Sequence, residues 1–191
     1  MRPGGHLVTA VGLGALAYAK TGSPALVAGC VAGAFLIDTD HYLDYLAVEG
    51  QWRRPSPLAF LRYAFALRTR RHVLPLHSLE LMVALALLAH VWPEPMLLGY
   101  LAGAMLHLVL DIAVNGEHLH QPLLFYWFVY RAWHGFAPQR LITPVTLPPD
   151  AGRRPIREFF TWRPAERPLP VPDAGETPAA DITPRLPSAA T

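Results

Sequence analysis

Four apolar segments alternate with polar stretches along the first two thirds of the chain. They cover residues 4–19, 24–37, 76–92 and 96–114. Ser23-Pro24 places a capping residue directly before a proline at the first helical position, and Pro75 and Pro95 suit that position in the later segments. Segments of this length fit either four short membrane helices or four buried helices of a soluble bundle.

Two shorter segments carry a different pattern. In residues 58–67, Leu58, Leu61 and Phe65 form an apolar side between arginines, which is typical of a helix lying on a membrane surface. Residues 123–131 are rich in Phe, Trp and Tyr but too short to cross a bilayer, which indicates an interfacial helix. The alternatives are a short helix in a solvated loop and a core helix of a soluble domain.

Proline dominates the end of the chain. Twelve of the twenty prolines follow Phe136, and long apolar runs are absent there. We expect residues 1–137 to form a helical membrane domain with a metal site, residues 138–164 an extended strap, and residues 165–191 a disordered proline-rich tail.

The first apolar segment has two interpretations. Arg2, the apolar run and Ala17-Tyr18-Ala19 resemble a secretory signal with its cleavage site. A retained helix is favoured, because three more apolar segments follow and because His6 lies where a metal ligand would be needed.

Composition favours a membrane protein. Hydrophobic residues make up 52% of the chain and charged residues 16%, against roughly 25% charged in an average soluble domain. The net charge of +2 implies no nucleic-acid partner. The single cysteine, Cys30, excludes an internal disulfide and a multi-cysteine zinc site.

Arginines predict the orientation. Six of them lie between the second and third apolar segments: Arg53, Arg54, Arg62, Arg68, Arg70 and Arg71. In the other two connections between apolar segments, Lys20 is the only basic residue. Because basic loops stay in the cytoplasm, this loop and both termini are expected there.

That topology brings eight ionisable residues to the cytoplasmic ends of four helices. They are His6, Asp38, Asp40, His41, His72, His77, His107 and Asp111. Each group alone is more simply a solvated or hydrogen-bonded pair, but grouped at matching helix ends they predict a divalent metal site. We therefore expect an all-α fold of about four short transmembrane helices in a bundle, with the polar site at the cytoplasmic ends and short interfacial helices beside it.

Residue types and spacing suggest individual roles. His107 and Asp111 are four apart and lie on one helical face, which Asn115 continues. Asp oxygens and His nitrogens suit zinc first, with manganese and iron as alternatives. The predicted ligands are His6, Asp38, Asp40, His41, His77, His107 and Asp111. Seven ligands exceed the four that one zinc ion uses, so one or two ions are expected.

Other polar residues surround these ligands. Glu80 lies three residues after His77 on the same helical face, and Glu80 or His72 is the expected general base. Ser78, Asn115, His118 and His120 are candidates for contacts to the ligands or the substrate. His90, near the far end of the third helix, is expected at the opposite membrane face.

These motifs resemble a known family. An early His6, Asp38-x-Asp40-His41, His72-x4-His77-Ser78 and His107-x3-Asp111 are similar to the predicted membrane-bound metal-dependent hydrolases, also described as LexA-binding, inner-membrane-associated hydrolases. The similarity covers about residues 1–135. This chain has Ile37, Val73 and Leu76 where that family commonly has Pro, Arg and Thr. The resemblance implies a bacterial inner membrane and metal-dependent hydrolysis, while His-x3-Asp also resembles soluble, all-helical zinc phospholipases C.

Two functions fit the pattern. The first is a membrane-embedded metal-dependent hydrolase that uses metal-activated water on a phosphoester or ester of an amphipathic substrate, with membrane lipid as its surroundings. The second is a non-enzymatic membrane protein with a structural or sensory metal site, whose basic loop and tail bind a partner. An open coordination position distinguishes the first from the second.

Overall fold

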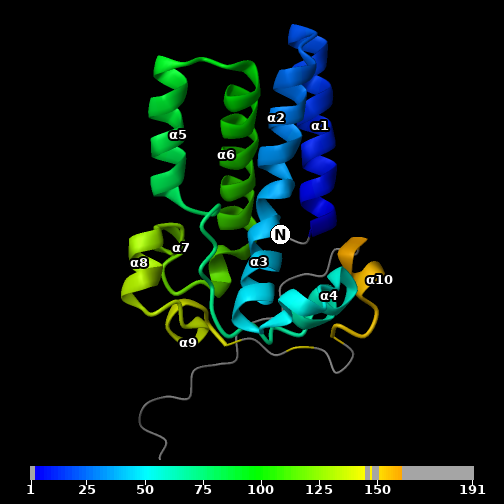
Figure 1. Cartoon of the computed structure of the whole chain (residues 1–191), viewed down its shortest axis with the longest axis vertical. Helices are drawn as coiled ribbons and strands as arrows, with labels where there is room; N and C mark the ends of the chain where they lie inside the picture. Colours follow the sequence, from blue (N-terminus) through cyan, green and yellow to red (C-terminus); the bar gives the residue numbers. More distant parts are fainter. Residues whose placement is uncertain (1–2, 145–146, 148–150, 161–191) are drawn as a thin grey trace, which may run out of the picture.

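The computed structural model describes residues 3–144, 147 and 151–160, and this part of the chain is helical with a single isolated β-bridge between Leu119 and Ile142. The predicted tail, residues 165–191, lies outside the described residues. Four helices stand side by side in the upper half of the molecule (Figure 1). They are α1 (Pro3–Thr21), α2 (Pro24–Ala34), α5 (Leu79–Val91) and α6 (Pro95–Asn115).

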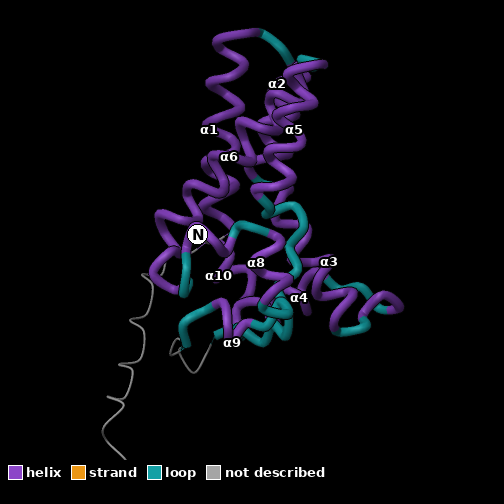
Figure 2. Tube along the Cα trace, turned by 90° about the vertical axis from the view of Figure 1, so that its left-hand side faces the viewer, coloured by secondary structure: helices purple, strands orange, loops and turns teal. Residues whose placement is uncertain are grey.

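Shorter helices form the lower half, as the side view in Figure 2 also shows. They are η1 (Leu36–Asp38), α3 (Thr39–Val48), η2 (Gln51–Arg53), α4 (Pro57–Phe65), η3 (Gly116–His118), α7 (Pro122–Phe125), α8 (Phe128–Trp133), α9 (Pro138–Leu141) and α10 (Pro155–Phe160). The strap predicted to be extended, residues 138–164, therefore contains α9 and α10 in its described part. The aromatic segment predicted as one helix is divided between α7 and α8.

Glycines let α2 and α6 approach each other closely. A Cβ atom added at Gly29 or Gly33 would overlap the carbonyl oxygens of Met96 and Tyr100 on α6. Reciprocally, a Cβ at Gly103 would overlap the carbonyl oxygen of Cys30 on α2. The small-residue spacings in these two helices thus face each other, and no larger side chain fits at this backbone contact.

The second apolar segment is interrupted before its predicted end. Helix α2 ends at Ala34, η1 follows, and α3 continues at an angle of 45° to α2. The expectation of one helix to Ile37 is therefore wrong. The interruption leaves the carbonyl of Ala34 without an intrahelical amide partner, so it is available to a side chain from another helix.

The prediction of about four transmembrane helices is not met among the described residues. By length and composition, one helical stretch, Pro95–His118, can cross a membrane, and the bent pair Pro24–Ala34 and Leu36–Val48 would be a second. Helix α5, with 13 residues, extends only about 20 Å. Helix α1 has sufficient length, but glycines, Thr9 and Lys20 dilute its apolar character.

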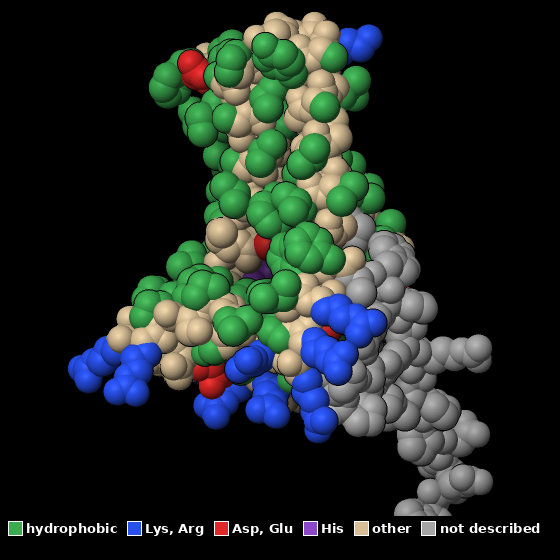
Figure 3. All heavy atoms as spheres, turned by 90° about the vertical axis from the view of Figure 1, so that its right-hand side faces the viewer, with side chains coloured by type: hydrophobic (Ala, Val, Ile, Leu, Met, Phe, Trp, Pro, Cys, Tyr) green, Lys and Arg blue, Asp and Glu red, His purple; other side chains and the backbone are tan. Residues whose placement is uncertain are grey.

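An apolar surface nevertheless covers the upper half (Figure 3). Large hydrophobic side chains on α1, α5 and α6 are exposed: Val8, Val11, Val83, Leu87, Val91 and Val109. In the same view, Lys and Arg side chains gather at the lower end. This division between an apolar upper half and a basic lower end is typical of a protein inserted in a bilayer.

Candidate metal centre

The polar cluster lies where the four upper helices meet the shorter helices below. Helix α1 provides His6, and α6 provides His107 and Asp111. Asp38 ends η1, His41 lies in the first turn of α3, and His77 lies just before α5. Four separate parts of the sequence thus bring their polar side chains to one point, within an interior that includes Ile37 and Leu108.

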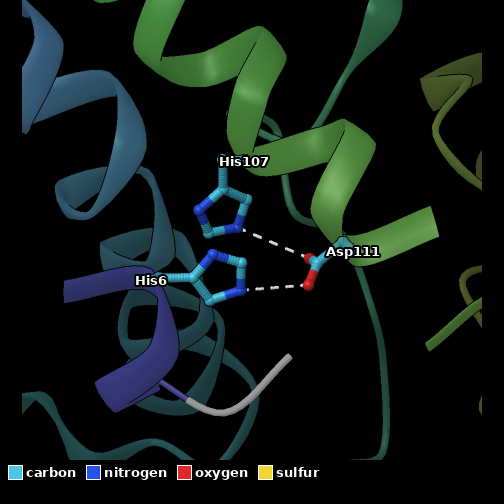
Figure 4. Close-up of side chains that lie close together, drawn as sticks. All are labelled: His6, His107 and Asp111. Atoms are coloured by element: carbon cyan, nitrogen blue, oxygen red, sulfur yellow. Dashed lines mark hydrogen bonds and ion pairs between the residues drawn. The ribbon is translucent and has the colours of Figure 1, made fainter. Parts of the chain in front are cut away.

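The first half of the cluster joins α1 to α6 (Figure 4). His6 Nε2 lies 3.0 Å from Asp111 Oδ1, and His107 Nε2 lies 3.4 Å from Asp111 Oδ2. The rings of His6 and His107 are stacked with centroids 3.7 Å apart. His6 is 1% exposed, and its Nδ1 has no hydrogen-bond partner among the described residues.

The second half is a triangle of potential ligand atoms. His77 Nε2 lies 3.1 Å from His107 Nε2. Asp38 Oδ1 lies 3.5 Å from each of these nitrogens. His41 extends the cluster, with its Nε2 3.8 Å from Asp38 Oδ1. Two sets of three residues, His6–His107–Asp111 and Asp38–His41–His77, each have ligand atoms within 4.8 Å of one another and so could hold a metal ion.

Hydrogen bonds fix which nitrogen of each ring faces the cluster centre. His77 Nδ1 lies 3.1 and 3.0 Å from the two oxygens of Asp40, and His107 Nδ1 lies 3.0 Å from the Ala34 carbonyl oxygen. A carboxylate or carbonyl oxygen can only accept, so both Nδ1 atoms donate. When its ring is neutral, each Nε2 therefore carries the lone pair and faces the other ring, as in metal-binding histidines.

Asp40, a predicted ligand, occupies a different place. It is fully buried, and besides the His77 ring its Oδ2 accepts hydrogen bonds from the amides of Leu76 and His77 at 3.0 and 3.3 Å. Its carboxylate is thus used to orient His77 and to hold the loop before α5. Asp38, two residues earlier, supplies the oxygen at the centre.

Two residues that the sequence analysis missed hold the same loop. Asp44 Oδ2 accepts from the amides of Val73 and Leu74 at 2.7 and 3.2 Å. Arg131, on α8, is fully buried and donates to the carbonyls of Val73, Leu74 and His77 at 3.2, 2.8 and 3.0 Å. The loop is therefore clamped through its amides by carboxylates and through its carbonyls by a guanidinium.

Sequence signals for these two residues are weak but present. Asp44 lies four residues after Asp40, on the same face of α3. Arg131 is the one charged residue in the aromatic segment 123–131. Burying a guanidinium there costs free energy unless its N–H groups all donate hydrogen bonds. Burial lowers the pKa of Arg131, and the charges of Asp40 and Glu80 oppose that shift, so the guanidinium remains charged.

Glu80, predicted as a general base, is placed elsewhere. Its Oε2 and Oε1 accept hydrogen bonds from the amides of Phe128 and Val129 at 2.8 and 3.0 Å, in the first turn of α8. Ser78 caps α5 by accepting from the Leu81 amide at 3.1 Å and donates its hydroxyl to Glu80 at 3.1 Å. Glu80 therefore joins α5 to α8, Ser78 supports its carboxylate, and neither residue is part of the cluster.

His72 lies in the wall of a small cleft that also reaches His41. The cleft, of about 20 Å³, is lined further by Tyr45, Phe60, Tyr63 and Arg71. Burial, together with the positive charges of His41 and Arg131, lowers the pKa of His72 to about 3. His72 is therefore neutral at physiological pH, and its Nε2 lies 3.2 Å from the Thr69 hydroxyl. So low a pKa makes it a weak general base.

The pKa of His77 moves in the opposite direction. Burial lowers it, but hydrogen bonds to Asp38 and Asp40 outweigh burial and raise it to about 9. In the absence of a cation, a proton can thus occupy the centre. A metal ion competes with that proton, because a ligating imidazole must be neutral.

The remaining candidates divide into two groups. Asn115 donates to Asp111 Oδ1 at 2.9 Å and so fixes a cluster carboxylate. His118 and His120 are not brought to the cluster: His118 Nε2 lies 3.6 Å from Glu117 Oε1, and His120 Nδ1 lies 3.1 Å from the Arg140 carbonyl oxygen. His90 is exposed in the last turn of α5, at the end remote from the site.

The fold and the site together define a class: an all-helical protein with an apolar outer surface above a buried His/Asp cluster. The sequence profile of the YdjM inner membrane protein family matches residues 1–162. The chain belongs to this family and is an inner membrane protein. No curated protein and no solved structure is detectably similar to it.

Proposed function

We propose that this protein is a metal-dependent hydrolase of the inner membrane, acting on a phosphoester or ester of an amphipathic substrate. Its cluster would bind one or two divalent cations, zinc first, with the site facing the cytoplasm. A cation bound there supplies a Lewis acid and acidifies a water molecule.

One observation carries the proposal: the short distance between two imidazole Nε2 atoms, whose rings both donate a hydrogen bond from Nδ1. The Nε2 atoms of His77 and His107 lie 3.1 Å apart. Two lone pairs at this distance repel each other unless a cation or a proton lies between them. Half-buried Asp38 and buried Asp111 add negative charge beside the two nitrogens, which also favours a bound cation.

The distances between these atoms match those expected between ligands of one metal ion. Two nitrogens bound to one tetrahedral zinc lie about 3.3 Å apart, for Zn–N bonds of about 2.05 Å. The triangle of His77 Nε2, His107 Nε2 and Asp38 Oδ1 has edges of 3.1, 3.5 and 3.5 Å. Three protein ligands of this kind leave a fourth position for water or substrate, as in catalytic zinc sites.

The exposed side of the cluster supports an enzyme over a structural site. The side chains of Asp38 and His41 are 24% and 34% exposed, whereas His6, His77 and His107 are at most 2% exposed. Because His41 also lines the small cleft, water in that cleft can reach this side of the cluster. A structural site would be closed on all sides.

The position of the site supports an amphipathic substrate. Exposed Leu36 and Leu43 flank in sequence the residues that open the cluster to the surface, so apolar side chains lie close to the opening. Arg71 on the cleft wall offers a cation to a phosphoryl group. A headgroup could thus reach the cluster while its chains stay in lipid.

Metal content and hydrolysis test the function together. We expect purified protein to hold about one or two zinc ions by elemental analysis and to cleave phosphoester or ester substrates presented in mixed micelles. His107→Ala and Asp111→Asn should each reduce metal content and abolish activity, since ligands act as a unit. His90→Ala, at the remote exposed end of α5, is the matched control and should change neither.

Two outcomes would contradict the proposal. Equal metal loss in His90→Ala and His107→Ala would remove the cluster as the binding site. Full metal content with no hydrolysis across phosphoester and ester panels would favour the structural or sensory alternative, with the basic loop and tail as the partner-binding parts.

A further inference from the structure

A second feature, separate from the metal centre, is a groove between α4 and α10. It has a volume of about 220 Å³ and is lined by Leu58, Arg62, Arg154, Pro155, Ile156 and Arg157. Figure 1 shows α4 and α10 side by side at the lower end, and the two helices are in contact. Three arginines from segments about ninety residues apart in sequence thus meet around one groove.

The arginines are held on a fixed frame. Gly152 has a left-handed backbone, with φ of +76°, and a Cβ atom there would lie 2.5 Å from the Arg62 carbonyl oxygen. Glu158 is 2% exposed, and its carboxylate accepts from the amides of Gly152 and Arg154 at 3.2 and 3.3 Å. These hydrogen bonds hold the turn that leads into α10, and the arginines that line the groove, Arg62, Arg154 and Arg157, are exposed.

Apolar side chains border the same groove. Leu58 and Ile156 line it and are 41% and 66% exposed, and Phe160 on the same helix is 68% exposed. Helix α10 also packs against the first turn of α1, where a Cβ on Gly4 would overlap the Phe159 carbonyl oxygen. From that turn α1 continues upward with exposed Val8 and Val11. The groove thus lies at the boundary between the basic end and the apolar surface.

We propose that this groove binds the phosphate headgroup of an anionic phospholipid of the surrounding membrane. One guanidinium group can donate two parallel hydrogen bonds to two phosphate oxygens, and three arginines around one groove suit a group that bears a full negative charge. A free phosphate or a soluble phosphoester would share that chemistry. The exposed Leu58, Ile156 and Phe160 favour a lipid, because its acyl chains cover apolar side chains that a soluble anion leaves in water.

Native mass spectrometry of the full chain, released from dodecyl maltoside, tests this site. Phosphatidylglycerol is added at increasing concentration, and bound lipid is counted against phosphatidylcholine as the zwitterionic comparison. Each arginine should contribute roughly a fivefold increase in affinity, the equivalent of about 1 kcal/mol. The variant R62Q/R154Q/R157Q should therefore lose the bound phosphatidylglycerol, and R62Q/R154Q should lose most of it.

A matched variant separates a defined site from diffuse attraction. R53Q/R54Q/R68Q removes the same charge from exposed arginines outside the groove and should keep the lipid. Equal loss in the two triple variants, or loss in neither, would overturn the proposal. Displacement of the lipid by equimolar inorganic phosphate would also overturn it, because the occupant would then be a soluble anion. Metal content and near-UV circular dichroism confirm folding of each variant and are expected to be unchanged, since the groove is distinct from the metal centre.

Discussion

At the residue scale, the candidate site depends on the neighbours of its histidines. Asp40 fixes the tautomer and rotation of His77, and the Ala34 carbonyl does the same for His107. Such partners would act on a bound metal without touching it, since they set the direction and basicity of each Nε2. The two rings are thereby aligned before any ion binds.

Substituting Asp40 by asparagine tests this alignment. Asp40→Asn keeps the size of the side chain but removes its charge and puts an amide donor beside the His77 loop, so metal affinity should fall roughly 10–100-fold. Asp44→Asn is the control, because Asp44 holds the same loop through amides without contacting the His77 ring. Metal affinity is measured by competition with a chelator of known affinity. Equal losses in both variants would mean that loop position, not imidazole orientation, sets the affinity.

The sequence could predict which residues gather but not which of them face the centre. The spacing of His107, Asp111 and Asn115 fixes one helical face, and the contacts of Asp111 with the other two follow from it. Asp38 and Asp40 could not be separated, because their directions depend on the interruption between α2 and α3. Arg131 was missed because the loop carbonyls to which it donates come together only in the folded chain.

At the element scale, the contact between α2 and α6 positions the site. Gly33 precedes Ala34, whose carbonyl binds His107, and Gly103 precedes His107 by one turn. Close backbone contact at these glycines therefore sets the distance between the Ala34 carbonyl and the His107 ring. Apolar periodicity and proline positions could predict both helices. Only the structure shows that the glycines of one helix face those of the other.

Substitution of Gly33 should disturb both packing and metal binding. Gly33→Ala places a Cβ against the Tyr100 carbonyl oxygen, a backbone atom that cannot move without displacing α6. We expect a lower unfolding temperature in detergent and weaker metal binding. Gly12→Ala on α1 is the control, since a Cβ there meets nothing within 4 Å, and it should be neutral or stabilising by up to about 1 kcal/mol. Equal unfolding temperatures for the two variants would show that the close helix contact does not limit stability.

The lengths of the helices were less predictable than their existence. Helix α5 begins at Leu79, after a Ser78 cap, because residues 73–77 are held in a loop by Asp40, Asp44 and Arg131. The sequence favours an earlier start at Pro75, since nothing local reveals that clamp. Tertiary hydrogen bonds thus shorten this helix to 13 residues, below the length that crosses a bilayer.

At the scale of the whole molecule, basic side chains and exposed hydrophobic side chains lie at opposite ends of the long axis. The arginine side chains gather at the lower end, and exposed hydrophobic side chains cover the upper half (Figure 3). Both the metal centre and the arginine groove lie below or at the boundary between them. A bilayer around the upper half would thus bring both sites to one membrane face, and the basic residues there predict that this face is cytoplasmic.

Cysteine labelling in intact cells tests this orientation. Glu94 is exposed in the connection between α5 and α6, and Arg54 is exposed at the basic end. The single native cysteine, Cys30, is 2% exposed, so it contributes little background. We expect Glu94→Cys to react with a membrane-impermeant maleimide in cells whose outer membrane is permeabilised. Arg54→Cys should react only after the inner membrane is opened, because moving its arginine-rich surroundings across the bilayer is costly. The reverse labelling pattern would place the candidate metal centre on the periplasmic side and would exclude cytoplasmic substrates. Reaction of both cysteines before the inner membrane is opened would show that the upper half does not cross the bilayer.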